Sequence, residues 1–298
     1  MEKKEKHKRI IWKRGMEITP ATFEDVDSYR DESFREIRRL LTVGRYGLLS
    51  NASKNVSVAL SDNGRVSVKV IQLMGVTRSG EFLDIEDQNI QISTPDDKGS
   101  DCYLVVHTNG IRELEINNVC YATDQYEFEF RTLSEIKDRS IPFAKLKNEH
   151  GRWFIQDLYV PPCLSISSDP ELIGIVRSTS HAVATIVEKL DGMARGYKVE
   201  MLRDVGLELS LYTMTETPQD FYKLLRRAVR LLESDDLDGR EKPEAVVHTP
   251  FDNNDILRSI VPLVEYVIRI KEIVSKQIVK EEPVVKKEEP KVDFFYEI

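Results

Sequence analysis

The side chains that could do catalytic or metal chemistry are dispersed along this sequence. Its five histidines fall at neither the HxxxH nor the HxH spacing that lets two imidazoles bind one metal ion. They are His7, His107, His150, His181 and His248. The sequence also lacks the GxSxG nucleophile elbow, the GxxxxGK(S/T) phosphate loop and the GxGxxG dinucleotide motif. We therefore expect no catalytic residue, no metal site, no cofactor and no enzymatic activity.

One acidic cluster, the run DDLDG at residues 235–239, superficially resembles a calcium-binding loop. Such a loop needs a bidentate glutamate at its twelfth position, because that side chain completes the oxygen shell around the ion. Counting from Asp235, the twelfth residue is Val246. A solvated loop explains the cluster better.

Three cysteines, Cys102, Cys120 and Cys163, form no CxxC pair. An odd and scattered set is typical of neither a disulfide framework nor a zinc site. Burial as small apolar side chains in a reducing cytosol explains them best.

Length, charge and hydropathy limit the classes of function. The 298 residues suffice for one large domain or two ordinary ones. A net charge of -8 argues against a protein that coats nucleic acid, because phosphate neutralisation needs clustered Lys and Arg. No apolar run reaches the roughly 20 residues that span a bilayer, and Lys13-Arg14 cuts short the apolar run Ile10–Trp12. We expect no signal peptide, no direct membrane insertion and a cytoplasmic location.

Residues 1–45 are predicted to form an N-terminal arm followed by one helix. Thr19-Pro20 is a plausible helix start, because proline is tolerated in the first turn. Apolar residues then recur at helical spacing up to Gly44. They are Phe23, Val26, Phe34, Ile37, Leu40 and Leu41.

Residues 46–169 show the alternation of half-buried strands, most clearly in the run 65–70, where valine alternates with polar residues. Turn signals divide the region. They are Asn63-Gly64, Ser79-Gly80 and Asn109-Gly110. Several short strands at this spacing predict a sandwich or a partly open barrel.

Residues 170–279 change to helical periodicity, which predicts an α-helical bundle. One long helix is expected from Leu172 to Tyr197, and a second over about 203–215. The last helix carries apolar residues at spacings of four and three in alternation, which is a heptad seam. They are Ile256, Ile260, Leu263, Val267, Ile270 and Val274. Isoleucine and valine on both seam positions favour coiled coils of three or four helices, so we expect this seam to join copies of the chain. The alternative is that the seam faces the core of the chain's own helical bundle.

Residues 280–298 contain repeated Glu-Glu-Pro blocks and mixed charge, which predict a disordered tail. The tail ends in an aromatic cluster of Phe294, Phe295 and Tyr296. Aromatic residues on a flexible tether suit a groove or a strand edge of a partner. Packing back on the chain's own domain is the alternative.

Eight positions of the N-terminal segment keep a distinctive spacing. They are Trp12, Gly15, Met16, Ile18, Pro20, Phe23, Asp27 and Tyr29. Segments at 75–83, 141–170 and 251–263 follow in a matching order. Together these residues resemble the TssK family of type VI secretion baseplate proteins. The chain departs from the family pattern at Arg14 and at Ala21-Thr22.

The resemblance implies an α+β multidomain fold, with an N-terminal antiparallel β-sandwich shoulder, like that of phage receptor-binding proteins, followed by an α-helical bundle neck. It implies a homotrimer whose shoulders bind the TssF and TssG wedge proteins and which links them to the membrane-anchoring complex at the inner face of the bacterial envelope. The family's C-terminal head is expected to be missing. Phe294, Phe295 and Tyr296 would then dock on a membrane-complex component.

The wedge-protein interface is expected at the apolar N-terminal segment, because large apolar anchors carry much of the energy of buried interfaces. Its residues are Trp12, Gly15, Met16, Ile18, Pro20 and Phe23. A staple that holds the first helix to the sandwich is the structural alternative. Two rival functions stay open. The first is a phage-type or contractile-particle tail adaptor, which neighbouring genes for sheath and wedge proteins would distinguish from a secretion baseplate protein. The second is a carbohydrate-binding or hydrolytic sandwich, which would need an aromatic-lined cleft with paired carboxylates.

Overall fold

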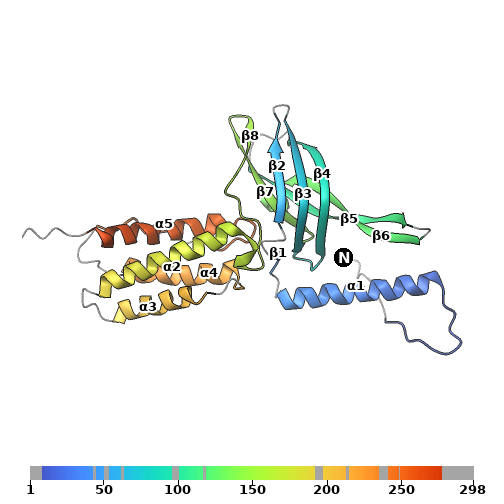
Figure 1. Ribbon diagram of the computed structural model, residues 1–298, viewed down its shortest axis with the longest axis horizontal. Helices are drawn as coiled ribbons and strands as arrows, with labels where there is room; N and C mark the ends of the chain where they lie inside the picture. Colours follow the sequence, from blue (N-terminus) through green and yellow to red (C-terminus); the bar gives the residue numbers. More distant parts are fainter. Residues whose placement is uncertain are drawn as a thin grey trace, which may run out of the picture.

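The protein is described by a computed structural model that covers residues 9–42, 45–49, 54–61, 64–95, 101–116, 119–191, 197–212, 215–234, 241–247 and 249–276. Within these ranges, two four-stranded sheets form one part of the molecule and the helices α2 to α5 pack beside one another in another (Figure 1). A separate helix, α1 (Pro20–Thr42), runs along one side of the sheets. The predicted α+β class is confirmed.

The first sheet is built around its third strand, which pairs with each of the other three. Its strands are β1 (Gly47–Leu48), β2 (Lys54–Leu60), β3 (Arg65–Val76) and β4 (Phe82–Ser93). β3 pairs with β4 along one edge, and with β2 and then β1 along the other, all antiparallel. Val66, Val68 and Val70 are completely buried, because alternate side chains of a strand point to the same face.

The second sheet has the order β6-β5-β7-β8. Its strands are β5 (Cys102–Ile116), β6 (Val119–Arg131), β7 (Ser140–Glu149) and β8 (Arg152–Ile155). The turn predicted at Asn109-Gly110 is wrong, since β5 runs through these residues. The register shifts there between Thr108 and Ile111, and Gly110 has a φ of +98°. The glycine makes a β-bulge rather than a turn.

The core lies between the two sheets. Leu73 and Ile85 of the first sheet and Leu104 and Ile141 of the second are almost fully buried in one hydrophobic cluster. The same cluster continues without a break into the helices, as far as Val274 of α5.

The chain crosses itself tightly where β1 meets the segment before α2. Leu48 N donates to Pro162 O (2.8 Å), and Leu164 N donates to Leu48 O (2.9 Å). Gly47 has a φ of +129°, and a Cβ atom at this position would lie 2.2 Å from the carbonyl carbon of Pro162. Only glycine fits, and the crossing ties the sheets to the helices.

The helical part consists of α2 (Pro170–Asp191), α3 (Tyr197–Ser210), α4 (Pro218–Ser234) and α5 (Ile256–Ser275). The prediction of one long helix reaching Tyr197 is wrong, because α2 ends at Asp191 and Tyr197 begins α3, which packs against α2. Gly192 and Gly196 fall between the two helices in the sequence, where glycine disfavours a continuous helix. None of the helices described is long and apolar enough to cross a bilayer.

The predicted seam of α5 faces the chain's own helices α2 and α4. Its six residues Ile256, Ile260, Leu263, Val267, Ile270 and Val274 are between 0% and 4% exposed. A second copy could contact them only if the helices separated. The structure therefore favours the intramolecular alternative for this seam.

Two of the three cysteines, Cys102 and Cys163, are buried as expected. Cys120 is exposed, so the expectation of burial is wrong for this residue. It lies on β6 in the part of the second sheet where β5 and β6 pair only with each other.

Candidate interaction site

The segment before α1 presents large apolar side chains to solvent. Trp12 is 53%, Ile18 58% and Phe23 57% exposed, and Met16 is 37% exposed. Gly15 and Pro20 are exposed as well. Every residue expected at the wedge-protein interface is thus at the surface of this chain.

Local hydrogen bonds shape this segment. Met16 N donates to Lys13 O (3.1 Å) across a turn in which Gly15 has a φ of +82°, a conformation that favours glycine. Thr19 N donates to Thr22 Oγ1 (3.2 Å), which satisfies a backbone donor at the start of α1.

Trp12 lies against the middle of α1. Together with Ile10, Tyr29, Phe34 and Ile37 it lines an apolar groove of about 280 Å³. Phe23, in the first turn of α1, does not line this groove. The structure therefore places Trp12 in this groove on α1 and Phe23 outside the groove.

α1 rests on the sheets with its polar side. Arg38 Nε donates to Gly80 O (3.0 Å), and the Arg38 guanidinium lies 6.0 Å from the ring centre of Phe82. The approach is close, since a Cβ atom at Gly80 would lie 2.7 Å from Arg35 O. The opposite side of the helix carries exposed apolar residues, which we call the helix stripe: Phe34, Ile37, Leu40 and Leu41. An amphipathic helix usually buries its apolar side, whereas α1 turns its apolar side to solvent and its polar side to the sheets in the isolated chain.

A buried polar cluster joins the second sheet to α5. Lys145 Nζ lies 2.7 Å from Asp255 Oδ2, and the Tyr103 hydroxyl donates to the same oxygen (3.0 Å). All three side chains are less than a tenth exposed. The other Asp255 oxygen accepts from Arg258 N (3.4 Å), so Asp255 is also the N-cap of α5.

The protonated forms of Tyr103 and Lys145 are stabilised. Burial and the neighbouring Asp255 carboxylate raise the pKa of Tyr103 to about 12. Burial opposes the charge of Lys145, but the hydrogen bond and the attraction to Asp255 outweigh it and raise the pKa of Lys145. Nothing in the sequence pairs these residues, which lie 110 and 152 positions apart. The one local signal is an aspartate directly before the apolar run of α5.

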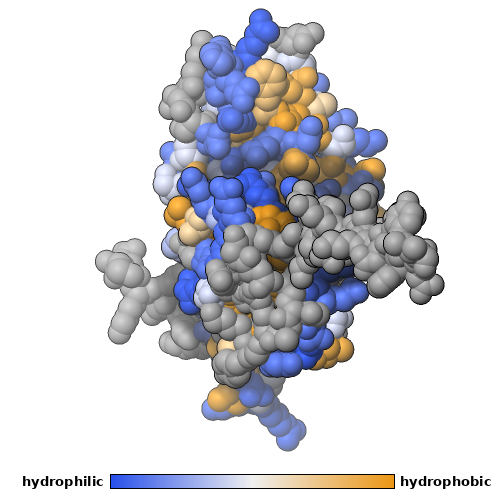
Figure 2. Space-filling model, turned by 90° about the vertical axis from the view of Figure 1, so that its left-hand side faces the viewer, coloured by the Kyte–Doolittle hydropathy of each residue, from blue (hydrophilic) through white to orange (hydrophobic). Residues whose placement is uncertain are grey.

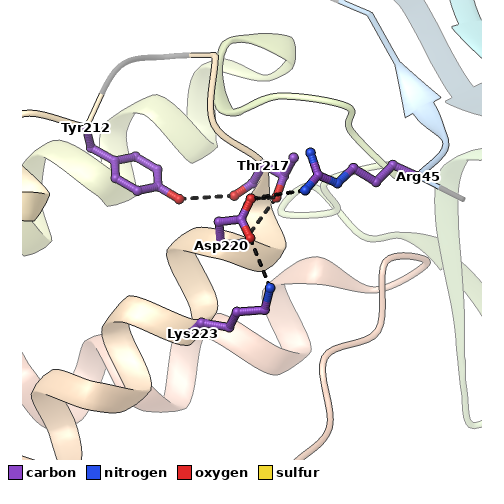
Figure 3. Close-up of polar contacts among 5 residues, drawn as sticks. All are labelled: Arg45, Tyr212, Thr217, Asp220 and Lys223. Carbon is purple, nitrogen blue, oxygen red and sulfur yellow. Dashed lines mark hydrogen bonds and ion pairs between the residues drawn. The ribbon is translucent and has the colours of Figure 1, made fainter. Parts of the chain in front are cut away.

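A second polar cluster ties the start of the sheets to α4 (Figure 3). Asp220 lies at its centre: it accepts from Thr217 Oγ1 (2.6 Å), pairs with Lys223 Nζ (3.0 Å) and lies 3.4 Å from an Arg45 amino group. The Tyr212 hydroxyl donates to Thr217 O (3.3 Å). Partial burial acts to raise the pKa of Asp220, but the hydrogen bonds from Thr217 and Lys223 prevail and lower it.

A polar groove of about 570 Å³ separates α1 from the hairpin of β5 and β6. It contains carboxylates and arginines, among them Glu81, which pairs with Arg139 Nε (3.1 Å). No group of three or more His, Cys, Asp or Glu side chains in the described ranges could hold a metal ion.

The helices expose little apolar surface by comparison. Among the described residues of α2 to α5, the large apolar side chains classed as exposed are Leu207 and Ile268. Seen from the helical end, hydrophobic residues gather in the upper part of the view, where the sheets lie (Figure 2). The other hydrophobic patches visible in this view are small and separate. The aromatic residues Phe294, Phe295 and Tyr296 lie outside the described residues.

The architecture places the chain in a class of proteins in which two packed β-sheets are followed by a group of helices. The solved structures that it resembles include TssK, and the chain is TssK-like in its fold. It matches a crystal structure of TssK with a TM-score of 0.62 and 11% identity, over 89% of this chain and 69% of that one. A TssK-TssF-TssG baseplate subcomplex of the type VI secretion system matches with a TM-score of 0.60 and 13% identity, over 90% and 99%. A type VI baseplate complex matches with a TM-score of 0.59 and 15% identity, over 90% and 100%. No protein-family model and no curated protein matches the sequence.

Proposed function

We propose that this chain is a structural subunit of a type VI secretion baseplate. One observation carries the proposal: about nine tenths of the chain matches the fold of solved structures that include TssK, a TssK-TssF-TssG subcomplex and a type VI baseplate complex. The exposed apolar N-terminal segment supports it, because surface of this kind is typical of a protein that binds other proteins. The role is mechanical, and the chain transforms no substrate.

In this proposal the two sheets are the shoulder and the helices α2 to α5 are the neck. The shoulder binds TssF- and TssG-type wedge proteins through Trp12, Gly15, Met16, Ile18, Pro20 and Phe23. Trp12 and Phe23 are the anchors, because exposed aromatic side chains gain most when a partner excludes water from them.

The proposal also includes self-association and a link to the envelope. Three copies would present three N-terminal segments, so modest affinity at each could give firm binding overall. The chain would act on the cytoplasmic side, at the inner face of the envelope. Phe294, Phe295 and Tyr296 would then contact a membrane-complex component, and deleting 281–298 should abolish capture of that component.

The experiment is co-purification with TssF- and TssG-type proteins of the organism that encodes this chain. A chain carrying Trp12→Ala and Phe23→Ala should recover at least tenfold less of them. Leu211→Ala is the control, because Leu211 is 76% exposed and lies after α3, away from the N-terminal segment. Equal recovery with both variants, or no recovery with the unchanged chain, contradicts the proposal.

A further inference from the structure

One face of α4 carries cationic side chains only. They stand at the spacing i, i+3, i+4 and i+7, which places them side by side on the helix. We call them the basic face: Lys223, Arg226, Arg227 and Arg230. Residues 221–232 contain no aspartate or glutamate, although the whole chain has 51 acidic against 43 basic residues. Solvated surfaces usually intersperse both signs of charge, so a face of one sign is typical of a surface that meets an anion.

The fold does not need the basic face. The opposite side of α4 is apolar and buried, and α4 packs with it against α3 and α5; its residues are Phe221, Leu224, Leu225, Ala228 and Leu232. In the basic face Arg226 is partly buried, and the other three residues are exposed. The charges therefore lie outside the core, where they can be changed without removing core contacts.

The basic face surrounds a hollow. Its four side chains and Leu231 line a space of about 430 Å³. The Arg226 guanidinium lies 5.6 Å from the ring centre of Tyr222, which limits where it can point. Arg226 Nε is buried and has no hydrogen-bond partner within the described part of the chain. This arginine therefore keeps a donor that its own chain leaves unsatisfied.

Ion pairs within the chain neutralise only half of the basic face. Lys223 Nζ lies 3.0 Å from Asp220 Oδ1, and an Arg227 amino group lies 3.1 Å from Glu208 Oε1. These four side chains are 36% to 64% exposed, so both pairs are weak and open to exchange. The other two arginines form no ion pair with any residue that the structure describes. Four cations and two carboxylates leave +2 at this surface of a chain whose net charge is -8.

We propose that the basic face of α4 docks an acidic helix of another protein. The cations span seven residues, or about 10 Å along the helix, and carboxylates at i, i+3, i+4 and i+7 of a partner helix span the same length. Each carboxylate can then meet one cation, and arginine can bind it through two parallel hydrogen bonds. Two copies of this chain cannot meet through their basic faces, because like charges repel. The inference goes beyond the proposed function and does not depend on it.

Fluorescence anisotropy with a labelled peptide tests the contact. The probe is an alanine-based helical peptide of about 20 residues with glutamate at i, i+3, i+4 and i+7. It should bind the full chain, and Arg226→Glu combined with Arg230→Glu should weaken binding at least tenfold. The matched control combines Lys69→Glu on β3 with Arg112→Glu on β5, which changes the net charge equally but on the sheets. The control should alter the affinity less than twofold.

A second peptide separates recognition of a helix face from attraction to charge alone. It has the same composition as the probe, but its glutamates are distributed around the helix. It should bind at least fivefold more weakly than the probe. Equal affinity of the two peptides overturns the proposal, as does equal binding of the probe by the basic-face variant and the control variant. Circular dichroism checks that both variants fold.

Other occupants of the basic face give other results, each of which overturns the proposal. Duplex DNA, or vesicles of anionic phospholipid, would bind through the same two arginines more tightly than the probe at equal salt. If residues 277–298 cover the face, a chain ending at Lys276 should bind the probe more tightly than the full chain does. If a second copy covers it, the unchanged chain should gain mass with concentration, and Arg226→Glu with Arg230→Glu should remove that gain.

The two proposals can fail separately. An unchanged chain that recovers no wedge proteins contradicts the baseplate function and leaves the basic face as a docking site. A basic-face variant that binds the probe as well as the control variant does contradicts the docking site and leaves the baseplate function.

Discussion

Lys145 Nζ on β7 lies 2.7 Å from Asp255 Oδ2 at the start of α5, and both side chains are less than a tenth exposed. The ion pair fixes the first turn of the last helix against the second sheet. Tyr103 shares the same carboxylate oxygen, and the Tyr159 hydroxyl donates to the neighbouring Asn254 O (2.9 Å). Sheet and helix are thus joined by charge and hydrogen bonds as well as by apolar packing.

Asp255→Asn should destabilise the protein by about 2 to 4 kcal/mol, because it leaves the Lys145 ammonium buried without its main partner. Asn remains a good N-cap, so the change tests the ion pair and not the helix cap. Urea unfolding measures the loss. Asp101, 3.2 Å from Lys145 Nζ, keeps the effect below complete loss of the pair.

The matched control is Glu149→Gln, which breaks the 3.0 Å pair between Lys147 and Glu149 on the same strand. Both of these side chains are about half exposed, so the effect should stay below about 1 kcal/mol. Equal effects of the two variants would contradict a structural role for the buried pair.

Stability should fall in alkaline solution. The folded-state pKa of Tyr103, about 12, and that of Lys145 lie above the ordinary values, so the folded chain holds these protons more tightly than the unfolded chain. Their contribution is complete below about pH 10 and is lost as the pH rises toward 12. Unfolding midpoints between pH 8 and 11.5 should therefore decline, and Tyr103→Phe should make the decline shallower.

A small loss of stability is expected in acid. The lowered pKa of Asp220 means that its contribution is present above its ordinary range near pH 4 and is lost as the pH falls through the folded-state value. The side chain is partly exposed, so the effect should stay below about 1 kcal/mol. Comparing Asp220→Asn with the unchanged chain should show a larger difference at pH 7 than at pH 3.

Gly47→Ala should destabilise the protein by more than about 4 kcal/mol, since its Cβ atom would lie 2.2 Å from the Pro162 carbonyl carbon and its φ is positive. Gly174→Ala in α2 is the control. Nothing lies within 4 Å of a Cβ atom there, so alanine should stabilise the helix by about 0.5 to 1 kcal/mol. Thermal unfolding of both variants measures the contrast.

Periodicity along the sequence predicted the helices and strands well but could not say what covers them. The apolar spacing in α1 and α5 is correct in both, yet α5 packs on its own chain while α1 turns its stripe outward. The sequence of an apolar helix face is the same whether the surface that covers it belongs to the same chain or to another chain. That is why the seam of α5 was expected between copies.

Three features could not be predicted from local sequence patterns. Asn109-Gly110 is as compatible with a β-bulge as with a turn, so the sequence does not predict that β5 and β6 continue to pair beyond it. The pair of Lys145 and Asp255 depends on contacts between residues 110 positions apart, which no local pattern specifies. Gly47 is a third case, because its fit against Pro162 exists only once the chain has crossed itself.

The unbroken hydrophobic cluster that runs from the sheets into the helices has a mechanical consequence. A continuous core resists rotation of the helices against the sheets. A torque applied at the far end of the helices would turn the sheets with it. The described part of the chain should therefore keep its sheets and helices in one relative orientation.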